Sequence, residues 1–179
     1  MGMDGVLCAL SAKRHAMLQA DPGLLFELTD PTHAGGEQMR GLLHLGKAWD
    51  ALDLLVSRRG EDALLGDAVL ARSGKSMRAE GGFGKAQFLA PVRVAKIAAA
   101  LAKLPARVVR DRYGELFGKT VHGNYGQETC ADDEIAFIRE QVAETQRREI
   151  EELEGKLTKL IALYAAAAKA GDGMMAVVV

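Results

Sequence analysis

The sequence predicts an α/β fold, with α+β as the alternative, in which one sheet is flanked by helices. Three observations lead to this fold class. Short apolar runs at both ends of the chain are typical of strands, another short strand is expected inside it, and four or more stretches with helical periodicity lie between them. Strands separated by helices usually share one sheet with helices on its faces. We therefore expect a single domain over residues 1–179.

The composition is that of an ordinary globular chain and excludes several classes of protein. Hydrophobic residues make up 49% and charged residues 26%, with a net charge of −1, which excludes collagen, a disordered chain and a basic nucleic-acid-binding domain. The longest apolar run has nine residues, at 160–168, whereas a membrane span needs about 20. Since no secretory leader is expected either, the prediction is a cytoplasmic protein that does not bind membranes.

The first half of the chain is expected to begin with a strand and to continue with helices. The strand is predicted at 5–10 and helices at 12–19, 22–28 and 45–56, with a segment at 64–70 that fits either type. Ser11 stands where its hydroxyl can cap the first helix, and Pro22 suits the first position of the second. In the third helix, apolar residues spaced three and four apart, Trp49 and Leu52 among them, form one face.

The second half is expected to alternate loops, helices and short strands. Residues 71–85 are interpreted as a glycine-rich basic loop before a strand at 87–89, followed by helices at 91–104, 106–117 and, after a long connection at 118–131, at 132–170. Gly171 is the expected C-terminal breaker of the last helix. Because charged residues at 144–149 interrupt its apolar stripe, this helix should kink there or project beyond the core. The apolar run at 174–179 lacks alternation, which favours a strand inside the sheet.

Several motifs occur in an order and spacing that resemble a known family. They are Met1-Gly2-Met3, Lys47-Ala48-Trp49-Asp50-Ala51-Leu52 followed by Leu54-Leu55, Leu64-Leu65-Gly66-Asp67-Ala68-Val69-Leu70, the segment from Gly84 to Pro91 with the helix after it, and Tyr164-Ala165-Ala166 before the last strand. Together they resemble the YfbM-like family of uncharacterised bacterial proteins, the domain of unknown function family 1877. The resemblance implies a three-layer αβα sandwich with a small mixed sheet, and it implies no established activity.

The sequence departs from that family's pattern at three places. The family usually has His where Asp53 stands, Arg near Gln87, and a Tyr-Pro turn with a nearby Trp where this chain has Val121-His122-Gly123-Asn124-Tyr125. If those positions form a common site, the site is altered or lost in this chain.

No cofactor, metal or catalytic residue is predicted. Gly74-Lys75-Ser76 matches the end of a phosphate-binding loop, but Val69 stands where that motif requires glycine. The two cysteines, Cys8 and Cys130, and the four histidines lack the spacing of a metal site. The net charge is +3 over residues 1–130 and −4 over 131–179, a basic balance too small to predict nucleic-acid binding.

The leading hypothesis is a non-catalytic, cytoplasmic protein-binding domain whose contact surface is the long acidic helix. Ile150, Leu153 and Leu157 would form that surface if the rest of the protein leaves them uncovered. The partner would be another protein or a second copy of the chain.

The alternative hypothesis is a small-ligand-binding protein or an enzyme. Its pocket would lie near Lys47, Trp49 and Asp50, where Gly84 and Gln87 would approach them. For Trp49, a role as a core anchor is favoured over a role in a ligand site. Whether the chain is an enzyme stays open, with binding favoured over catalysis.

Overall fold

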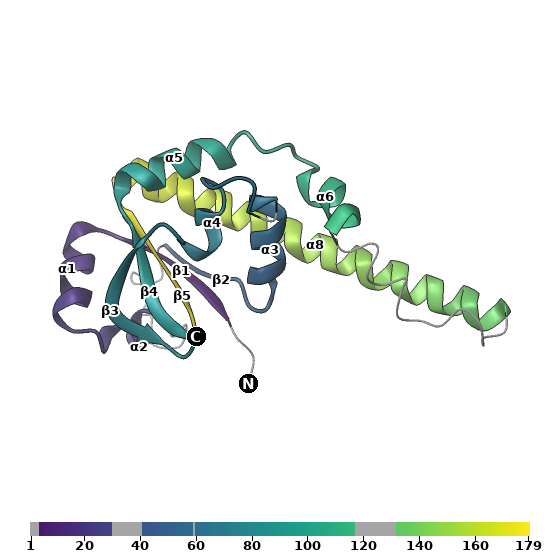
Figure 1. The fold of residues 1–179 in the computed structure, drawn as a ribbon, viewed down its shortest axis with the longest axis horizontal. Helices are drawn as coiled ribbons and strands as arrows, with labels where there is room; N and C mark the ends of the chain where they lie inside the picture. Colours follow the sequence, from purple (N-terminus) through teal and green to yellow (C-terminus); the bar gives the residue numbers. More distant parts are fainter. Residues whose placement is uncertain (1–3, 30–40, 59, 117–131) are drawn as a thin grey trace.

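The computed structural model describes residues 4–29, 41–58, 60–116 and 132–179 and shows a sheet covered by helices (Figure 1). In chain order the elements are β1 (Gly5–Leu10), α1 (Ala12–Ala20), α2 (Leu24–Thr29), β2 (Leu42–His44), α3 (Ala48–Ser57), α4 (Asp67–Leu70), β3 (Lys75–Gly81), β4 (Gly84–Leu89), α5 (Pro91–Leu101), α6 (Val108–Leu116), α8 (Asp132–Ala170) and β5 (Gly173–Val178). Met1-Gly2-Met3 and the connection at 118–131, which contains His122 and Cys130, lie outside the described residues.

Five strands form one sheet in the order β2-β1-β5-β4-β3. The last strand, β5, lies between β1 and β4, so the prediction that the end of the chain enters the sheet interior is confirmed. The expected mixed sheet is wrong in one respect, because every described strand pairing is antiparallel. For β3 and β4 the reason is local: only Gly82 and Phe83 separate them, and so short a connection makes a hairpin.

Helices cover both faces of the sheet, which makes the fold a three-layer αβα sandwich (Figure 1). Successive side chains of a strand point to opposite faces. In β1, Leu7 and Ala9 join the core cluster formed with α3, α5 and α8, whereas Val6 and Cys8 join a second cluster formed with α1 and α2. The continuous apolar sequence of β1 therefore follows from burial on both faces.

The long helix α8 has 39 residues, and its two halves differ in whether they pack on the core. Its C-terminal half packs on the core through Leu153, Leu157, Leu160 and Tyr164, all of them buried. Figure 1 shows the N-terminal half continuing in the same direction, away from the sheet. Of the two expected alternatives, projection is therefore the one observed. Gly171, with a φ of +71°, ends the helix as expected.

Two parts of the sheet differ from the sequence-based expectation. Residues 75–89 form a hairpin instead of a loop with a short strand, with Met77 and Ala79 of β3 buried on the α1 and α2 side. The strand β2 was not expected, because its three residues are too short for a recognisable pattern. The ambiguous segment at 64–70 contains the short helix α4.

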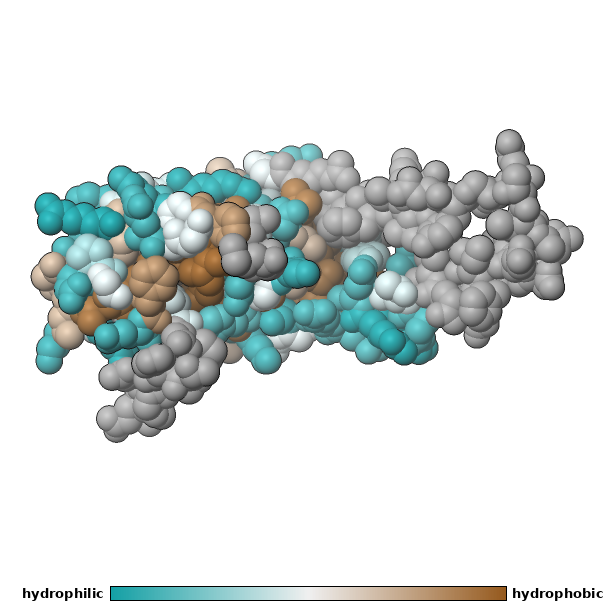
Figure 2. All heavy atoms as spheres, turned by 90° about the horizontal axis from the view of Figure 1, so that it is seen from below, coloured by the Kyte–Doolittle hydropathy of each residue, from teal (hydrophilic) through white to brown (hydrophobic). Residues whose placement is uncertain are grey.

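The outer surface of the described residues is mainly hydrophilic. Figure 2 shows apolar side chains gathered in the middle of the face seen from below, the side on which the C-terminus and the β3–β4 turn lie in Figure 1. Phe83 of that turn is 52% exposed. No helix in the described ranges has both the length and the apolar character needed to cross a membrane.

Candidate functional site

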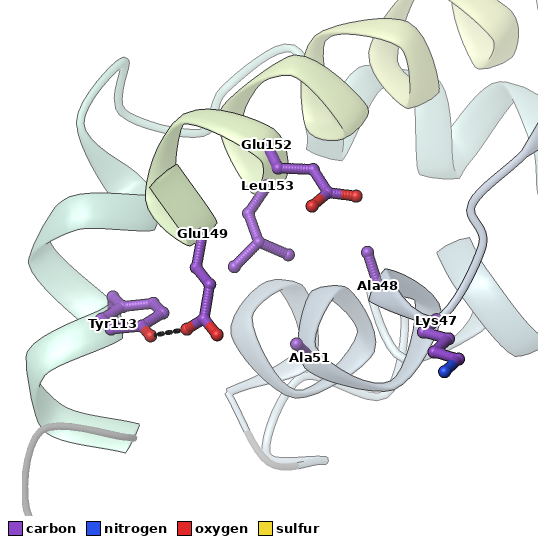
Figure 3. Close-up of a pocket in the computed structure, with 7 residues that line it drawn as sticks. All are labelled: Lys47, Ala48, Ala51, Tyr113, Glu149, Glu152 and Leu153. Carbon is purple, nitrogen blue, oxygen red and sulfur yellow. Dashed lines mark hydrogen bonds between the residues drawn. The ribbon is translucent and has the colours of Figure 1, made fainter. Parts of the chain in front are cut away.

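A groove of about 350 Å³ lies between α3 and α8, with α6 at one end (Figure 3). The residues that line it come from three separate parts of the sequence. They are Lys47, Ala48, Ala51, Tyr113, Glu149, Glu152 and Leu153.

The floor of the groove is apolar. Ala48 and Ala51 belong to the first two turns of α3, and both are half-buried. Leu153 of α8 faces them and is only 4% exposed. The short alanine side chains leave an open space above α3, which an apolar side chain of a bound molecule could fill.

The rim of the groove carries two carboxylates from α8. Tyr113 of α6 donates a hydrogen bond to Glu149, and burial, together with this carboxylate, raises the pKa of Tyr113. The phenol is therefore a neutral donor at neutral pH. The carboxylate of Glu152 lies over the start of α3 and has no hydrogen-bond or ion-pair partner among the described residues. In Figure 3 the ammonium of Lys47 points away from both carboxylates.

The helix α6 is tied to both walls of the groove. Arg112 donates from Nη1 to the carbonyl oxygens of Leu55, at 2.5 Å, and Val56, at 3.1 Å, near the end of α3. Arg110 forms an ion pair with Glu154 of α8 at 2.8 Å. Together with the packing of Val108, Val109 and Tyr113 in the core, these contacts place α6 across the end of the groove and Tyr113 beside Glu149.

A second hollow, of about 580 Å³, lies beside the segment between α3 and β3. Asp53 is 2% exposed at its edge and receives two hydrogen bonds from Arg72, at 3.0 Å and 2.6 Å. Burial raises the pKa of Asp53, although the Arg72 guanidinium acts to lower it.

A neighbouring network surrounds Asp67, which is 1% exposed. Its carboxylate accepts from the backbone N–H of Ser73 at 2.7 Å, from the hydroxyl of Ser73 at 2.5 Å and from Nε of Arg93 at 2.8 Å. Burial acts to raise the pKa of Asp67, but these hydrogen bonds outweigh it and lower the pKa. Both buried aspartates are already paired within the protein. We therefore infer that the residues around this hollow hold the 60–73 segment in place.

The structure separates the residues expected at a ligand pocket. Lys47 lines the groove, whereas Trp49 packs its side chain over Gly5 and Asp50 is exposed on α3 outside the groove lining. Gly84 and Gln87 belong to β4, where Gln87 bonds to Ser76 at 3.1 Å. The described residues therefore do not form the expected pocket from these five positions.

The expected apolar contact strip on α8 needs correction. Leu153 and Leu157 are buried against the core, and Ile150 is half-buried beside them, so these three side chains form the inner face of the helix. Their helical spacing predicts an apolar stripe, but the rest of the protein covers nearly all of it, and Leu153 lines the groove with the 4% of its surface that stays exposed.

Sequence reasoning missed most of the groove lining. Glu149 and Glu152 stand three residues apart and next to Leu153, a spacing that places them on one side of the helix. Nothing in the sequence connects Tyr113 to them. Among the described residues, no group of three His, Cys, Asp or Glu side chains is placed to hold a metal ion.

Comparisons with known proteins identify the family. A family model described as a domain of unknown function (DUF1877) matches residues 1–177. The fold is similar to the crystal structure of a protein of unknown function, YfbM from Escherichia coli, with a TM-score of 0.57 and 16% sequence identity over 98% of this chain and 99% of that chain. No curated protein matches the sequence. The chain belongs to the DUF1877 family, and the YfbM-like resemblance is confirmed.

Proposed function

We propose that this DUF1877 protein is a non-catalytic, cytoplasmic protein-binding domain and that the groove between α3 and α8 is its binding surface. The observation that carries the proposal is the combination of an apolar floor with a rim carboxylate, Glu152, that has no partner within the part of the chain the structure describes. An amphipathic helix laid into such a groove buries its apolar side chains and leaves its polar side chains at the edge.

The size of the groove suits one or two anchoring side chains. A volume of about 350 Å³ is at the lower end of the range for pockets that enclose a drug-sized ligand. Protein interfaces, by contrast, often depend on a few side chains that enter small, well-packed pockets. The floor formed by Ala48, Ala51 and Leu153 would receive such an anchor.

Filling the floor tests the proposal. Ala51→Trp places a large side chain in the groove, so we expect at least about tenfold weaker binding of the partner, because its anchor loses the space it enters. Partners would be isolated by affinity capture and crosslinking from the source cells, and their Kd would then be measured with purified proteins. The matched control is Ala99→Trp on the exposed side of α5. Equal affinity of the two variants for the recovered partner would contradict the proposal.

A small ligand in the same groove is the second candidate. Lys47, Tyr113, Glu149 and Glu152 bring charged and hydrogen-bonding groups to one apolar hollow, as in many small-molecule sites. A thermal-shift screen against metabolites would test this alternative. A compound that stabilises the wild type and the Ala99→Trp variant but not Ala51→Trp would favour it.

A further inference from the structure

We infer that the segment entering the groove is basic and amphipathic, with a Lys or Arg side chain about one helical turn from an apolar anchor. This inference rests on the proposed function and specifies the partner's chemistry. It follows from the charge that lines the groove and from the position of that charge next to the apolar floor.

The groove presents negative charge that its own lining does not neutralise. Glu149 accepts a hydrogen bond from Tyr113, a donor that carries no positive charge. Glu152 has no partner among the residues described. Lys47 is the one basic residue in the described lining, and Figure 3 shows its ammonium pointing away from both carboxylates.

The nearby arginines of α6 and α8 whose side chains the structure describes have other partners, and Arg112 donates to the carbonyl oxygens of Leu55 and Val56. Arg110 pairs with Glu154, and Arg147 and Arg148 both pair with Glu144. The region of the long helix that lines the groove therefore offers carboxylates to a partner, in keeping with the net charge of −4 over residues 131–179.

The spacing of these groups indicates how far apart the apolar and basic side chains of the bound segment lie. Glu149, Glu152 and Leu153 lie within about one turn of α8, and Ala48 and Ala51 lie within one turn of α3. A partner helix that places an apolar side chain over the alanines would bring residues three or four positions away to the two carboxylates. An acidic segment would meet repulsion at the same positions.

Defined peptides and charge variants test the inference. The probe is a fluorescent peptide of Leu and Lys at amphipathic helical spacing, the comparison peptide has Glu in place of Lys, and binding is followed by fluorescence anisotropy. We expect the wild type to bind the Lys peptide and not the Glu peptide, with weaker binding at higher salt. Glu152→Gln should weaken binding up to about fivefold, since the pair is exposed. Glu152→Lys should weaken it at least about tenfold.

Glu151→Gln is the matched control, because Glu151 is exposed on α8 one residue away but does not line the groove. It removes the same charge from the protein and should leave binding unchanged. Equal effects of Glu151→Gln and Glu152→Gln would show non-specific attraction and overturn the inference. Matching thermal unfolding midpoints would establish that each variant is folded.

Failure of the inference and failure of the proposed function give different results. If Ala51→Trp abolishes binding of the partner recovered from cells while Glu152→Lys leaves that binding intact, the groove binds protein but the basic-partner inference is wrong. If the Glu peptide binds as well as the Lys peptide, the inference is also wrong. A doubled mass in light scattering that reverts to monomer in Ala51→Trp would identify a second copy as the occupant and overturn the assignment of a separate basic partner.

Discussion

Asp53 is a buried charge whose environment explains why an aspartate can stand there. Its carboxylate is 2% exposed and held by both terminal nitrogens of Arg72, whose side chain is half exposed. Nη1 of Arg72 also donates a hydrogen bond to the carbonyl oxygen of Gly66. At a position where the resembled family usually has His, this chain therefore uses an ion pair that joins α3 to the segment leading into β3.

Removing Arg72 should destabilise the protein in a pH-dependent way. Burial already raises the pKa of Asp53, so its contribution to stability is full below the unfolded pKa and is lost as the pH rises through the folded pKa. Arg72→Met removes the cation that acts to lower the pKa of Asp53. We expect a loss of about 2 kcal/mol at pH 7, below the roughly 3–5 kcal/mol typical of a broken buried pair because Arg72 is half exposed. Urea unfolding at pH 7 and pH 4 should show a smaller loss at the lower pH.

The double variant Asp53→Asn with Arg72→Met is the control for this prediction. It removes the titrating carboxyl together with its partner, so most of the pH dependence attributed to the pair should disappear. If Arg72→Met lowers the free energy of unfolding by the same amount at both pH values, the guanidinium acts through packing and its hydrogen bond to Gly66, not through the charge of Asp53.

At the scale of elements, the sequence predicted the structure well where it has a continuous apolar run or a clear helical periodicity. The strand at 5–10, the helix from Pro91 and the helix at 132–170 were all placed correctly. The hairpin at 75–89 was missed because the residues it buries toward α1 and α2 are Met77, Ala79 and Ala86, and the small side chains among them give a weak alternating signal. The antiparallel pairing of β1 with β5 depends on contacts between the two ends of the chain, which local sequence does not encode.

The hairpin turn packs tightly against the end of β5, and adjacent glycines test this contact. A Cβ added at Gly81 would lie 2.5 Å from a methyl carbon of Val177 and 2.6 Å from the carbonyl oxygen of Val178. Because a backbone oxygen cannot move aside cheaply, Gly81→Ala should lower the free energy of unfolding by about 1–3 kcal/mol. Chemical denaturation of purified protein measures the change.

Gly82→Ala is the neighbouring control. A Cβ at that position would come no closer than 3.6 Å to Val179, an ordinary van der Waals distance. We therefore expect little change in its stability. If both variants lower the free energy of unfolding equally, the turn does not pack against β5 as closely as the structure shows.

At the scale of the molecule, the candidate groove depends on convergence of segments far apart in the sequence. Lys47 and Leu153 were both singled out from the sequence, but for different hypotheses, and the structure places them in one groove. Their proximity could not be predicted, because it results from the packing of α3 against α8. Tyr113 reaches the same groove because α6 packs Val108, Val109 and Tyr113 into the core, and Arg112 bonds α6 to the end of α3.

The long helix should show two levels of stability, divided where it leaves the core. Residues 153–167 bury one face through Leu153, Leu157 and Tyr164, whereas most side chains at 143–149 are exposed and can open without loss of core packing. Hydrogen exchange followed by mass spectrometry should therefore show faster exchange at 143–149, by at least about tenfold. Leu157→Ala removes a packed side chain and should lower protection at 153–167 while changing 143–149 little. Uniform protection along the helix would contradict this prediction.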